Sequence, residues 1–421
     1  MRSPTFASAR VEIRNARPLV GVLDQLVSAG SNVVLTIIVA RAVSVERFGA
    51  FGVVMIVFSI VIGATRALLG EQLLTRDPDS AACRPRDIAA DGAILGTACG
   101  GAVAMAALAV PSLRSPLLVL AALLPMLVCQ DALRYWGFSE GRAAFVLVLD
   151  AVWLLLVVVG FLMALVDAWR PTLSTALVLW GSSSALSLVL AYLVLGRGAM
   201  GRGEAPSRPL RQVRETFAIG RLYLVQFATT YAATALAFAV APAVMGLREA
   251  GQLRAAFFSF SAVNVLVAAA TTVGVTLLVR RSTHSSIGPL VFAESAFLSL
   301  FVIANIAVIL YVPDSIGRAV LGASFEGAQR FSVPVGLGVT LSVFGLGPLA
   351  GLRAAGLARE LTHARLWFAV TAPVLCLAFA MYDGRSARGF ALGWLVSNFV
   401  GTAALWIYWG RSGNTAHIER T

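Results

Sequence analysis

Residues 48–70 read FGAFGVVMIVFSIVIGATRALLG, an apolar stretch in which Arg66 is the one charged residue. A run of roughly 20 apolar residues is the length that an α-helix needs to cross the hydrocarbon core of a bilayer. The stretch therefore predicts a membrane-spanning helix. Similar stretches follow one another along most of the chain, so we expect the bilayer to be the solvent of the whole molecule.

The overall composition points the same way. Of the 421 residues, 58% are hydrophobic and 13% are charged, whereas an ordinary soluble protein has about 45–50% and about 25%. Too few polar side chains remain to cover a soluble fold of this size, which excludes a soluble enzyme. The four cysteines lie far apart without CxxC spacing, so neither a metal site nor a disulfide framework is predicted, and no motif indicates a cofactor.

The apolar stretches number twelve, six in each half of the chain, separated by charged breaks or breaks that contain Gly and Pro. They are expected at 18–43, 48–70, 88–110, 116–137, 143–166, 172–196, 219–245, 251–279, 288–312, 331–352, 364–382 and 387–409. The longest polar break, 197–218, contains five Arg and predicts a cytoplasmic linker. The expected fold is an all-α polytopic membrane protein with a six-helix bundle at 1–196 and a second one at 219–421.

The arginines predict the orientation of the chain. All 33 basic residues are Arg, and the formal net charge is +12. If the N-terminus is inside, 20 of them fall in inner segments and nine in outer loops, and Arg-rich loops stay on the cytoplasmic side. Both termini are therefore expected in the cytoplasm. Anionic lipid headgroups are the expected partners of this charge, and nucleic acid is not, because there is no soluble basic domain.

The two halves show a weak internal repeat. When Gln25 is placed against Gln226, residues 19–52 align with 219–254, and one inserted residue keeps Gly49 opposite Gly251. Each segment has a helix, a short outer loop with Arg and Glu, and a second helix. Two six-span halves are typical of a transporter whose binding site lies between repeats.

Three segments carry a resemblance to a known family. The first has Ala40, Arg41, Glu46, Phe48, Gly49 and Phe51 within ARAVSVERFGAFG. The second is QDALRYWGFSEGRAAFVLVLDAVW, with Gln130, Asp131, Arg134, Tyr135, Gly141 and Asp150. The third, weaker one joins LGASFEGAQRFSVPV to GLRAAGLAR. Together they resemble bacterial polysaccharide-export flippases of the multidrug/oligosaccharidyl-lipid/polysaccharide (MOP) exporter superfamily.

The resemblance implies a MATE-like fold and a flippase rather than an enzyme. Its substrate would be polyprenyl-diphosphate-linked oligosaccharide, moved by alternating access from the cytoplasmic to the outer leaflet of a bacterial plasma membrane. Glycosyltransferases or a polymerase of the same pathway would be its functional partners. Guanidinium groups in a cavity suit such a substrate because they bind phosphate in a bidentate manner.

Ionisable side chains inside spans are the candidate site residues, because each costs about 2.5–3.5 kcal/mol to insert and is expected to face a cavity or a partner. The candidates for substrate binding are Arg66, Arg134, Arg41 and Arg254. The candidates for cation coupling or a structural ion pair are Asp24, Asp131, Glu71 and Glu294.

Local spacing leaves several of these roles open. Asp131 and Arg134 are three residues apart on one helix and can neutralise each other. Arg66 has Glu71 five residues on, a poor spacing for a pair, so it is expected either to bind a substrate anion or to extend toward the headgroups. Asp24 has no basic residue one turn away, which suits a coupling carboxylate or a hydrogen bond to a neighbouring helix.

Two alternative functions differ from the flippase in the residues that they require. A drug or cation antiporter of the same superfamily would have fewer cavity arginines and more carboxylates, so the charge of the cavity discriminates between them. A polytopic glycan polymerase or glycosyltransferase would need acidic groups on the outer face. The longest expected outer loop, 313–330, offers only Asp314 and Glu326, which disfavours catalysis.

Overall fold

The computed structural model describes residues 6–75, 84–199, 288–355 and 357–412, and all but positions 222, 226, 229, 230, 232 and 262 between 220 and 263. The predicted linker at 197–218 therefore lies almost entirely outside the described residues, as does the second part of the span predicted at 251–279. Within the described ranges the chain is helical and contains no strand.

Two compact units emerge from the contacts along the chain. Unit 1 comprises 1–39 and 58–227, and unit 2 comprises 40–57 and 228–421. The short segment 40–57 thus packs with the second half of the chain, although it belongs to the predicted N-terminal bundle. Helices α1 (Phe6–Ala42) and α2 (Val45–Thr65) each contribute residues to both units.

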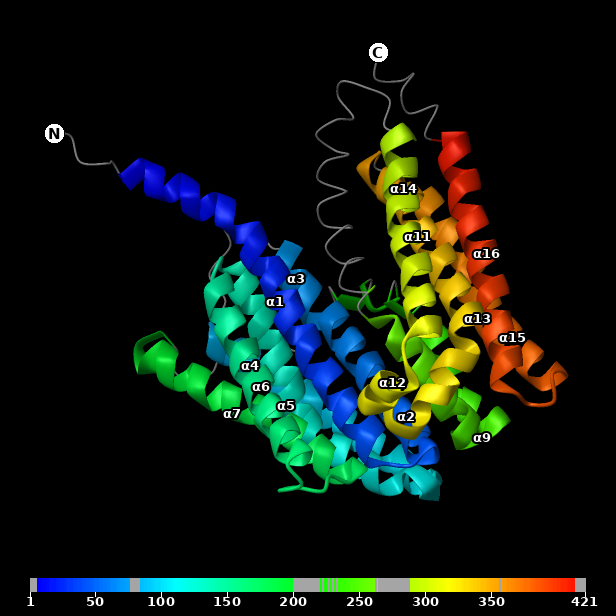
Figure 1. Ribbon diagram of the computed structural model, residues 1–421. Coiled ribbons are helices and arrows are strands. Elements are labelled where there is room, and N and C mark those ends of the chain that lie inside the picture. The colour runs from blue at the N-terminus through cyan, green and yellow to red at the C-terminus, as the bar shows by residue number, and fades with distance from the viewer. Residues whose placement is uncertain are drawn as a thin grey trace, which may run out of the picture. The chain divides into compact units, whose positions relative to one another are not determined.

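Unit 1 is built from long helices that run side by side (Figure 1). Besides most of α1 and α2, they are η1 (Arg66–Gly70), α3 (Glu71–Thr75), α4 (Pro85–Ala109), η2 (Pro111–Leu113), α5 (Arg114–Ser139), α6 (Ala143–Leu165) and α7 (Leu173–Ala199). Helices α4 and α5 pack closely along their length, because three glycines at four-residue spacing face α5. A Cβ on Gly96 would lie 2.7 Å from the Leu124 carbonyl oxygen, and one on Gly100 would lie 2.5 Å from that of Ala121. Small residues at this spacing are what membrane helices use to pack closely.

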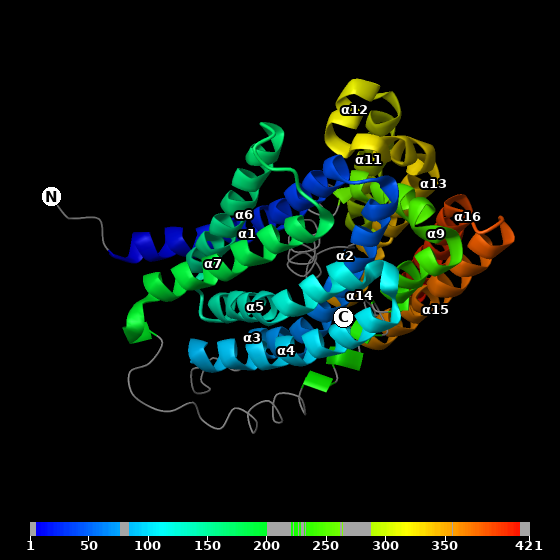
Figure 2. The same cartoon turned by 90° about the horizontal axis from the view of Figure 1, so that it is seen from below.

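Unit 2 is centred on α13, which packs most extensively against α9, α11 and α16 (Figure 2). Its helices are α9 (Ala233–Ser259), α11 (Gly288–Tyr311), α12 (Asp314–Leu321), η4 (Gly322–Ser324), α13 (Phe325–Phe344), α14 (Leu346–Ala354), α15 (Ala358–Tyr382) and α16 (Ala387–Ser412). Its core contains an aromatic cluster of Phe238, Phe257, Phe390 and Trp394, with ring centroids 4.9–5.5 Å apart. These rings hold α9 against α16.

Ten helices among the described residues are long and apolar enough to cross a membrane. They correspond to ten of the twelve predicted spans, and the all-α polytopic fold is confirmed. The other two predicted spans, 219–245 and 251–279, meet within α9, where Gly246 has φ 83° and ψ 160°. This backbone conformation breaks the helix, and helical geometry resumes at Leu247.

The outer loop expected at 313–330 is helical from Asp314 onward, through α12, η4 and the first turns of α13. Pro313 caps α12, Asp314 occupies its first turn, and Gly322, with φ 54°, ends it. Helix α12 buries Gly317 and Leu321 and leaves Ile316 exposed. The pattern of buried and exposed residues covers only the eight residues of α12. This length is too short for the pattern to distinguish a helix from a loop within the surrounding apolar sequence.

The two glycines aligned by the internal repeat lie against each other in unit 2. A Cβ on Gly49 would lie 2.0 Å from the carbonyl oxygen of Leu247, and a Cβ on Gly251 would lie 2.0 Å from that of Val45. The contact is reciprocal, as expected for two hairpins related by an approximate two-fold axis. Helices α2 and α9 therefore cross with backbone against backbone.

Replacement of Gly49 by alanine is expected to destabilise unit 2. The new Cβ would overlap a main-chain carbonyl, which cannot rotate away as a side chain would, and overpacking of this kind costs about 1–3 kcal/mol. Thermal unfolding of the purified protein in detergent measures the effect. Gly101→Ala is the matched control, because a Cβ there would meet nothing within 4 Å. Equal unfolding temperatures for the two variants would contradict the backbone crossing.

Candidate functional site

Four of the predicted ionisable residues come together inside unit 1. Asp24 comes from α1, Arg66 from η1, and Asp131 and Arg134 from α5; Asp150, on α6, completes the group. We call these five residues the charge cluster. All lie within helices, so the cluster is assembled by packing four elements together instead of by a loop.

Arg134 is the centre of the charge cluster. Its Nη2 donates to Asp24 Oδ2 at 2.9 Å, and its Nε lies 2.9 Å from Asp150 Oδ2. The contact with Asp131, from Nη1 to Oδ1, is longer at 3.5 Å. The Arg134 side chain is 6% exposed, and those of Asp24 and Asp150 are fully buried. Pairing is what makes burial of these charges tolerable in a membrane-spanning bundle.

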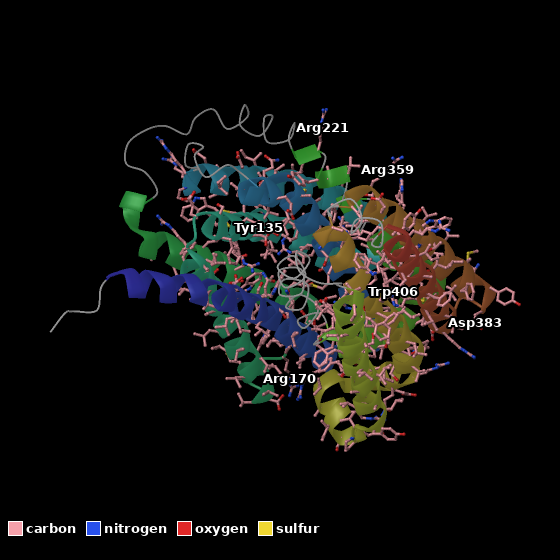
Figure 3. The ribbon with its side chains drawn as sticks, turned by 90° about the horizontal axis from the view of Figure 1, so that it is seen from above. Tyr135, Arg170, Arg221, Arg359, Asp383 and Trp406 are labelled. Atoms are coloured by element: carbon pink, nitrogen blue, oxygen red, sulfur yellow. The ribbon has the colours of Figure 1, made fainter. Side chains whose placement is uncertain are left out.

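Arg66 forms a separate bidentate pair with Asp131. Its Nε donates to Oδ2 at 2.9 Å and its Nη2 to Oδ1 at 2.7 Å. The Arg66 side chain is 40% exposed, whereas that of Asp131 is 8% exposed. The ring of Tyr135, labelled in Figure 3, lies beside the guanidinium, with its centroid 5.9 Å from Cζ. Arg66 thus presents one edge to a buried carboxylate and keeps another edge accessible.

These contacts change the interpretation that local spacing suggested. The pair expected from i, i+3 spacing, Asp131 with Arg134, exists but is the longest contact of Arg134. Arg66, expected to be the freer group, is paired with Asp131, and Asp24 is paired with Arg134. The cluster has three carboxylates and two guanidinium groups, so its formal charge is negative by one.

Polar side chains complete the surroundings of the cluster unevenly. Gln130 Nε2 donates to Asp150 Oδ1 at 2.8 Å. In contrast, the buried Oδ1 of Asp24 has no hydrogen-bond partner within the described part of the chain. An unsatisfied buried carboxylate oxygen is costly, so Asp24 retains an acceptor that a proton or a cation could satisfy.

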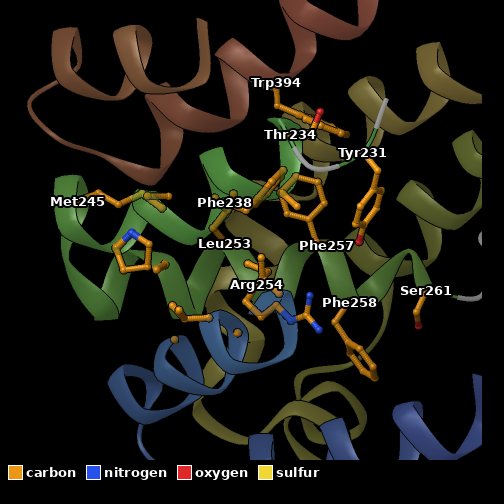
Figure 4. Close-up of a pocket in the computed structure, with 18 residues that line it drawn as sticks. Tyr231, Thr234, Phe238, Met245, Leu253, Arg254, Phe257, Phe258, Ser261 and Trp394 are labelled. Atoms are coloured by element: carbon orange, nitrogen blue, oxygen red, sulfur yellow. The ribbon is translucent and has the colours of Figure 1, made fainter. Parts of the chain in front are cut away.

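Unit 2 contains a pocket of about 390 Å³. It lies along α9 and is lined mainly by apolar and aromatic side chains, including Phe238, Phe257, Phe258 and Trp394 (Figure 4). Arg254 is the only charged residue among its 18 described lining residues. The polar groups that accompany it are the hydroxyls of Tyr231, Thr234 and Ser261 and the indole N–H of Trp394.

Arg254 is held in the pocket by packing. Its aliphatic stem lies over Gly52, where a Cβ would be 3.3 Å from Arg254 Cγ. No carboxylate in the described residues lies within ion-pair distance of the guanidinium, and the buried Nε has no hydrogen-bond partner there. Tyr231 contributes to the electrostatic environment of Arg254. The pocket therefore combines an unneutralised positive charge with an apolar wall.

The remaining predicted residues lie outside both sites. Arg41 is exposed and donates through Nη1 to the carbonyl oxygen of Ala319, at the C-terminal turn of α12, where a cation is favoured by the helix dipole. Glu294, on α11, is half-buried and has no ion-pair or hydrogen-bond partner in the described residues. Glu71 begins α3, one turn of chain after Arg66.

Sequence reasoning missed the aromatic lining of the unit 2 pocket and the central role of Asp150. The position of Asp150 could have identified it as a candidate site residue, because an ionisable residue in the middle of a predicted span needs a partner. The aromatic residues gave no such signal, since a Phe or Trp within an apolar span can face lipid as well as line a pocket. Their common orientation follows only from the packing of α9 against α16.

Comparison with known proteins adds information on the fold. No family model matches the sequence, and no curated protein matches it. Among solved structures, an inward-facing multidrug resistance MATE family transporter of the MOP superfamily matches with a TM-score of 0.66 and 14% identity, over 93% of this chain and 96% of that one. The lipid II flippase MurJ, in an inward closed conformation, matches with a TM-score of 0.68 and 10% identity, over 92% and 87%.

An outward-facing MATE family transporter of the same superfamily matches with a TM-score of 0.58 and 15% identity, over 96% of each chain. At these identities the matches establish the fold. The resemblance to MOP exporters seen in the sequence is confirmed at that level, and the chain is a multi-pass membrane protein. Its architecture is the all-α fold shared by MATE transporters and MurJ.

Proposed function

We propose that this protein is a flippase for polyprenyl-diphosphate-linked oligosaccharide. It carries the glycan head from the cytoplasmic to the outer leaflet of a bacterial plasma membrane by alternating access, for synthesis of a cell-surface polysaccharide. Both termini lie in the cytoplasm in this proposal. The fold supports it, because the matched structures include both a lipid flippase and transporters.

The charge of the unit 2 pocket is the observation that carries the proposal. A diphosphate head is anionic and cannot cross hydrocarbon unaided, and a guanidinium group binds phosphate through two parallel hydrogen bonds. Arg254 provides that group, and no described residue of the pocket lining is a competing carboxylate. A cationic drug would meet repulsion from Arg254 in the same pocket, so the alternative of a cation antiporter is disfavoured.

The aromatic wall suits the rest of such a substrate. Ligand sites are lined predominantly by apolar and aromatic side chains, with few polar groups that fix the orientation of the ligand. In Figure 4 the rings of Phe238 and Phe257 stand between Arg254 and the labelled Thr234 and Trp394. The pocket can thus hold an anionic group at Arg254 and a less polar portion of the substrate against the rings.

Coupling is assigned to unit 1 in this proposal. Asp24 is the coupling carboxylate, because it is fully buried and one of its oxygens remains without a partner in the described structure. Arg134 keeps Asp24 in place, while Arg66 is the accessible cation of the cluster. Asp131 and Arg134 serve as structural ion-pair residues.

Leaflet-resolved labelling of glycan tests the function directly. In cells depleted of this protein and lacking any second flippase, outer-face labelling of lipid-linked glycan is expected to fall while the total amount rises after permeabilisation. Synthesis precedes transport, so the substrate accumulates on the cytoplasmic leaflet. Cells that carry the Arg254→Lys variant should show an intermediate pattern, because Lys keeps the charge but lacks the fork.

The two alternatives give different results in the same cells. Loss of a glycan polymerase would leave single repeat units labelled at the outer face. Loss of a drug antiporter would leave both glycan pools unchanged and would increase sensitivity to cationic compounds. Unchanged outer labelling without intracellular accumulation would therefore overturn the proposed substrate and leave the fold unaffected.

A further inference from the structure

The Arg66–Asp131 pair lies at the border between buried and accessible parts of unit 1. The fork of Arg66 is satisfied by both oxygens of Asp131, at 2.9 and 2.7 Å. Its third nitrogen, Nη1, has no hydrogen-bond partner among the described residues, and the side chain is 40% exposed. An oxyanion can therefore reach this guanidinium without unfolding any helix.

We propose that Arg66 is an exchange residue. Its guanidinium separates from Asp131 and binds an oxyanion of the substrate instead, and this exchange links substrate binding to uptake of one proton by the charge cluster. Phosphate and carboxylate bind a guanidinium fork in the same geometry, so they compete for it. The inference rests on the proposed function in one respect, because it takes the oxyanion from the diphosphate-linked substrate, at a step distinct from binding of the head in the unit 2 pocket.

The charge count explains why a proton would follow. With Arg66 in place, three carboxylates face two guanidinium groups. Once Arg66 binds the substrate, Asp24, Asp131 and Asp150 share Arg134 alone. Two uncompensated negative charges in a buried cluster are costly, and one proton taken from water by a carboxylate removes one of them. The proton returns to water when the substrate leaves and Arg66 pairs with Asp131 again.

Few other titratable groups in the described part of unit 1 face the exchanging pair. On α5 they are Arg134 and Tyr135, on α1 Asp24, and on α6 Asp150; Glu71, on α3, interacts electrostatically with Tyr135. Arg134 already contacts three carboxylates and cannot replace Arg66 fully. Among the residues that the structure describes, the neighbourhood therefore supplies no second cation to compensate Asp131.

The linkage has a definite sign. If binding of the oxyanion brings one proton, affinity rises as pH falls, by at most about tenfold per pH unit. By reciprocity, protonation of the cluster strengthens binding of the oxyanion by the same factor. Asp131→Asn removes the competitor for Arg66, so this variant should bind more tightly than the wild type at high pH and should lose the additional pH dependence.

Binding of a polyprenyl diphosphate to the full-length protein in detergent, at about pH 6 and pH 8, tests the exchange. The ionisation of the ligand itself is the same for every protein variant, so the difference in pH dependence between wild type and Asp131→Asn belongs to the cluster. We expect this difference to be up to about tenfold per pH unit, with tighter binding by Asp131→Asn at pH 8. Weaker binding by Asp131→Asn at both pH values, with an unchanged slope, would overturn the exchange.

Asp91→Asn is the matched control. Asp91 is a buried carboxylate on α4 of the same unit, 2% exposed, with no contact to Arg66 or Arg134. Its replacement should leave the pH dependence of binding at the wild-type value. An equal loss of pH dependence in Asp91→Asn would show that the effect does not come from the cluster.

A measurement on the wild type alone covers the case in which Asp131→Asn fails to fold. Calorimetry in buffers of different ionisation enthalpy, corrected for the free ligand, counts the protons taken up on binding. About one proton supports the exchange, and none overturns it. If the wild type does not bind polyprenyl diphosphate at all, the proposed function fails first. Binding without proton uptake refutes only the exchange.

Discussion

Replacement of Arg134 by alanine is expected to destabilise the protein strongly, so that little folded protein accumulates in the membrane. Arg134 contacts Asp24, Asp131 and Asp150, and its removal leaves two fully buried carboxylates without a guanidinium. Breaking a buried pair by removing one partner costs about 3–5 kcal/mol, which exceeds any other single change considered. The amount of monodisperse protein after extraction in detergent, and its unfolding temperature, measure the effect.

Companion variants separate the partners of Arg134. The triple variant Arg134→Ala, Asp24→Asn, Asp150→Asn keeps only the Arg66–Asp131 ion pair, whose two charges cancel. Most of the stability lost in Arg134→Ala should therefore return. Arg134→Ala with Asp131→Asn should not recover, because it leaves Asp24 and Asp150 unpaired and also deprives Arg66 of its carboxylate. The opposite order of recovery would show that Asp131 is the principal partner.

Arg170→Ala is the matched control for this experiment. The Arg170 side chain is exposed and projects outward from unit 1 (Figure 3). No described residue forms an ion pair with Arg170, so its removal should change the unfolding temperature little, as is usual for surface substitutions. A similar loss of protein in Arg170→Ala would mean that the total arginine content, and not the cluster, controls accumulation.

Replacement of Arg254 by alanine is expected to remove most of the affinity for a diphosphate-linked glycan while the protein remains folded. Arg254 has no carboxylate partner in the described structure, so its loss leaves no buried charge uncompensated. Hydrogen bonds to a charged group contribute about 1.5–3 kcal/mol, which corresponds to about a ten- to hundredfold weaker binding. Binding to purified protein and flipping in reconstituted vesicles both measure the loss.

Arg248→Ala is the matched control on the same helix. The Arg248 side chain is 73% exposed and lies 3.8 Å from Glu46, an exposed pair outside the pocket. Such pairs contribute little to stability, and binding of the diphosphate should be unchanged. If Arg254→Ala binds and flips the substrate like the wild type, the unit 2 pocket is not the site of the anionic head.

The sequence by itself determined the class of fold and most of the helix positions. A helix that crosses a membrane satisfies its backbone hydrogen bonds internally and needs about 20 apolar residues. Both requirements are local, so composition and spacing along the chain reveal them. The same reasoning marked Asp24, Arg66, Asp131, Arg134 and Arg254 as residues with a role, because a charge inside a span always needs an explanation.

Only the tertiary structure decided what each of these charges contacts. Spacing rules reach one turn along a single helix, and thus identified Asp131 as the partner of Arg134 but could not place Asp24 or Asp150 beside it. In the same way, Arg66 pairs with Asp131, which lies 65 residues away in the sequence, whereas Arg254 has no carboxylate partner among the described residues. The physical reason is that the face a helix turns toward its neighbours depends on how the bundle packs. The sequence of an almost uniformly apolar span does not show which face that is.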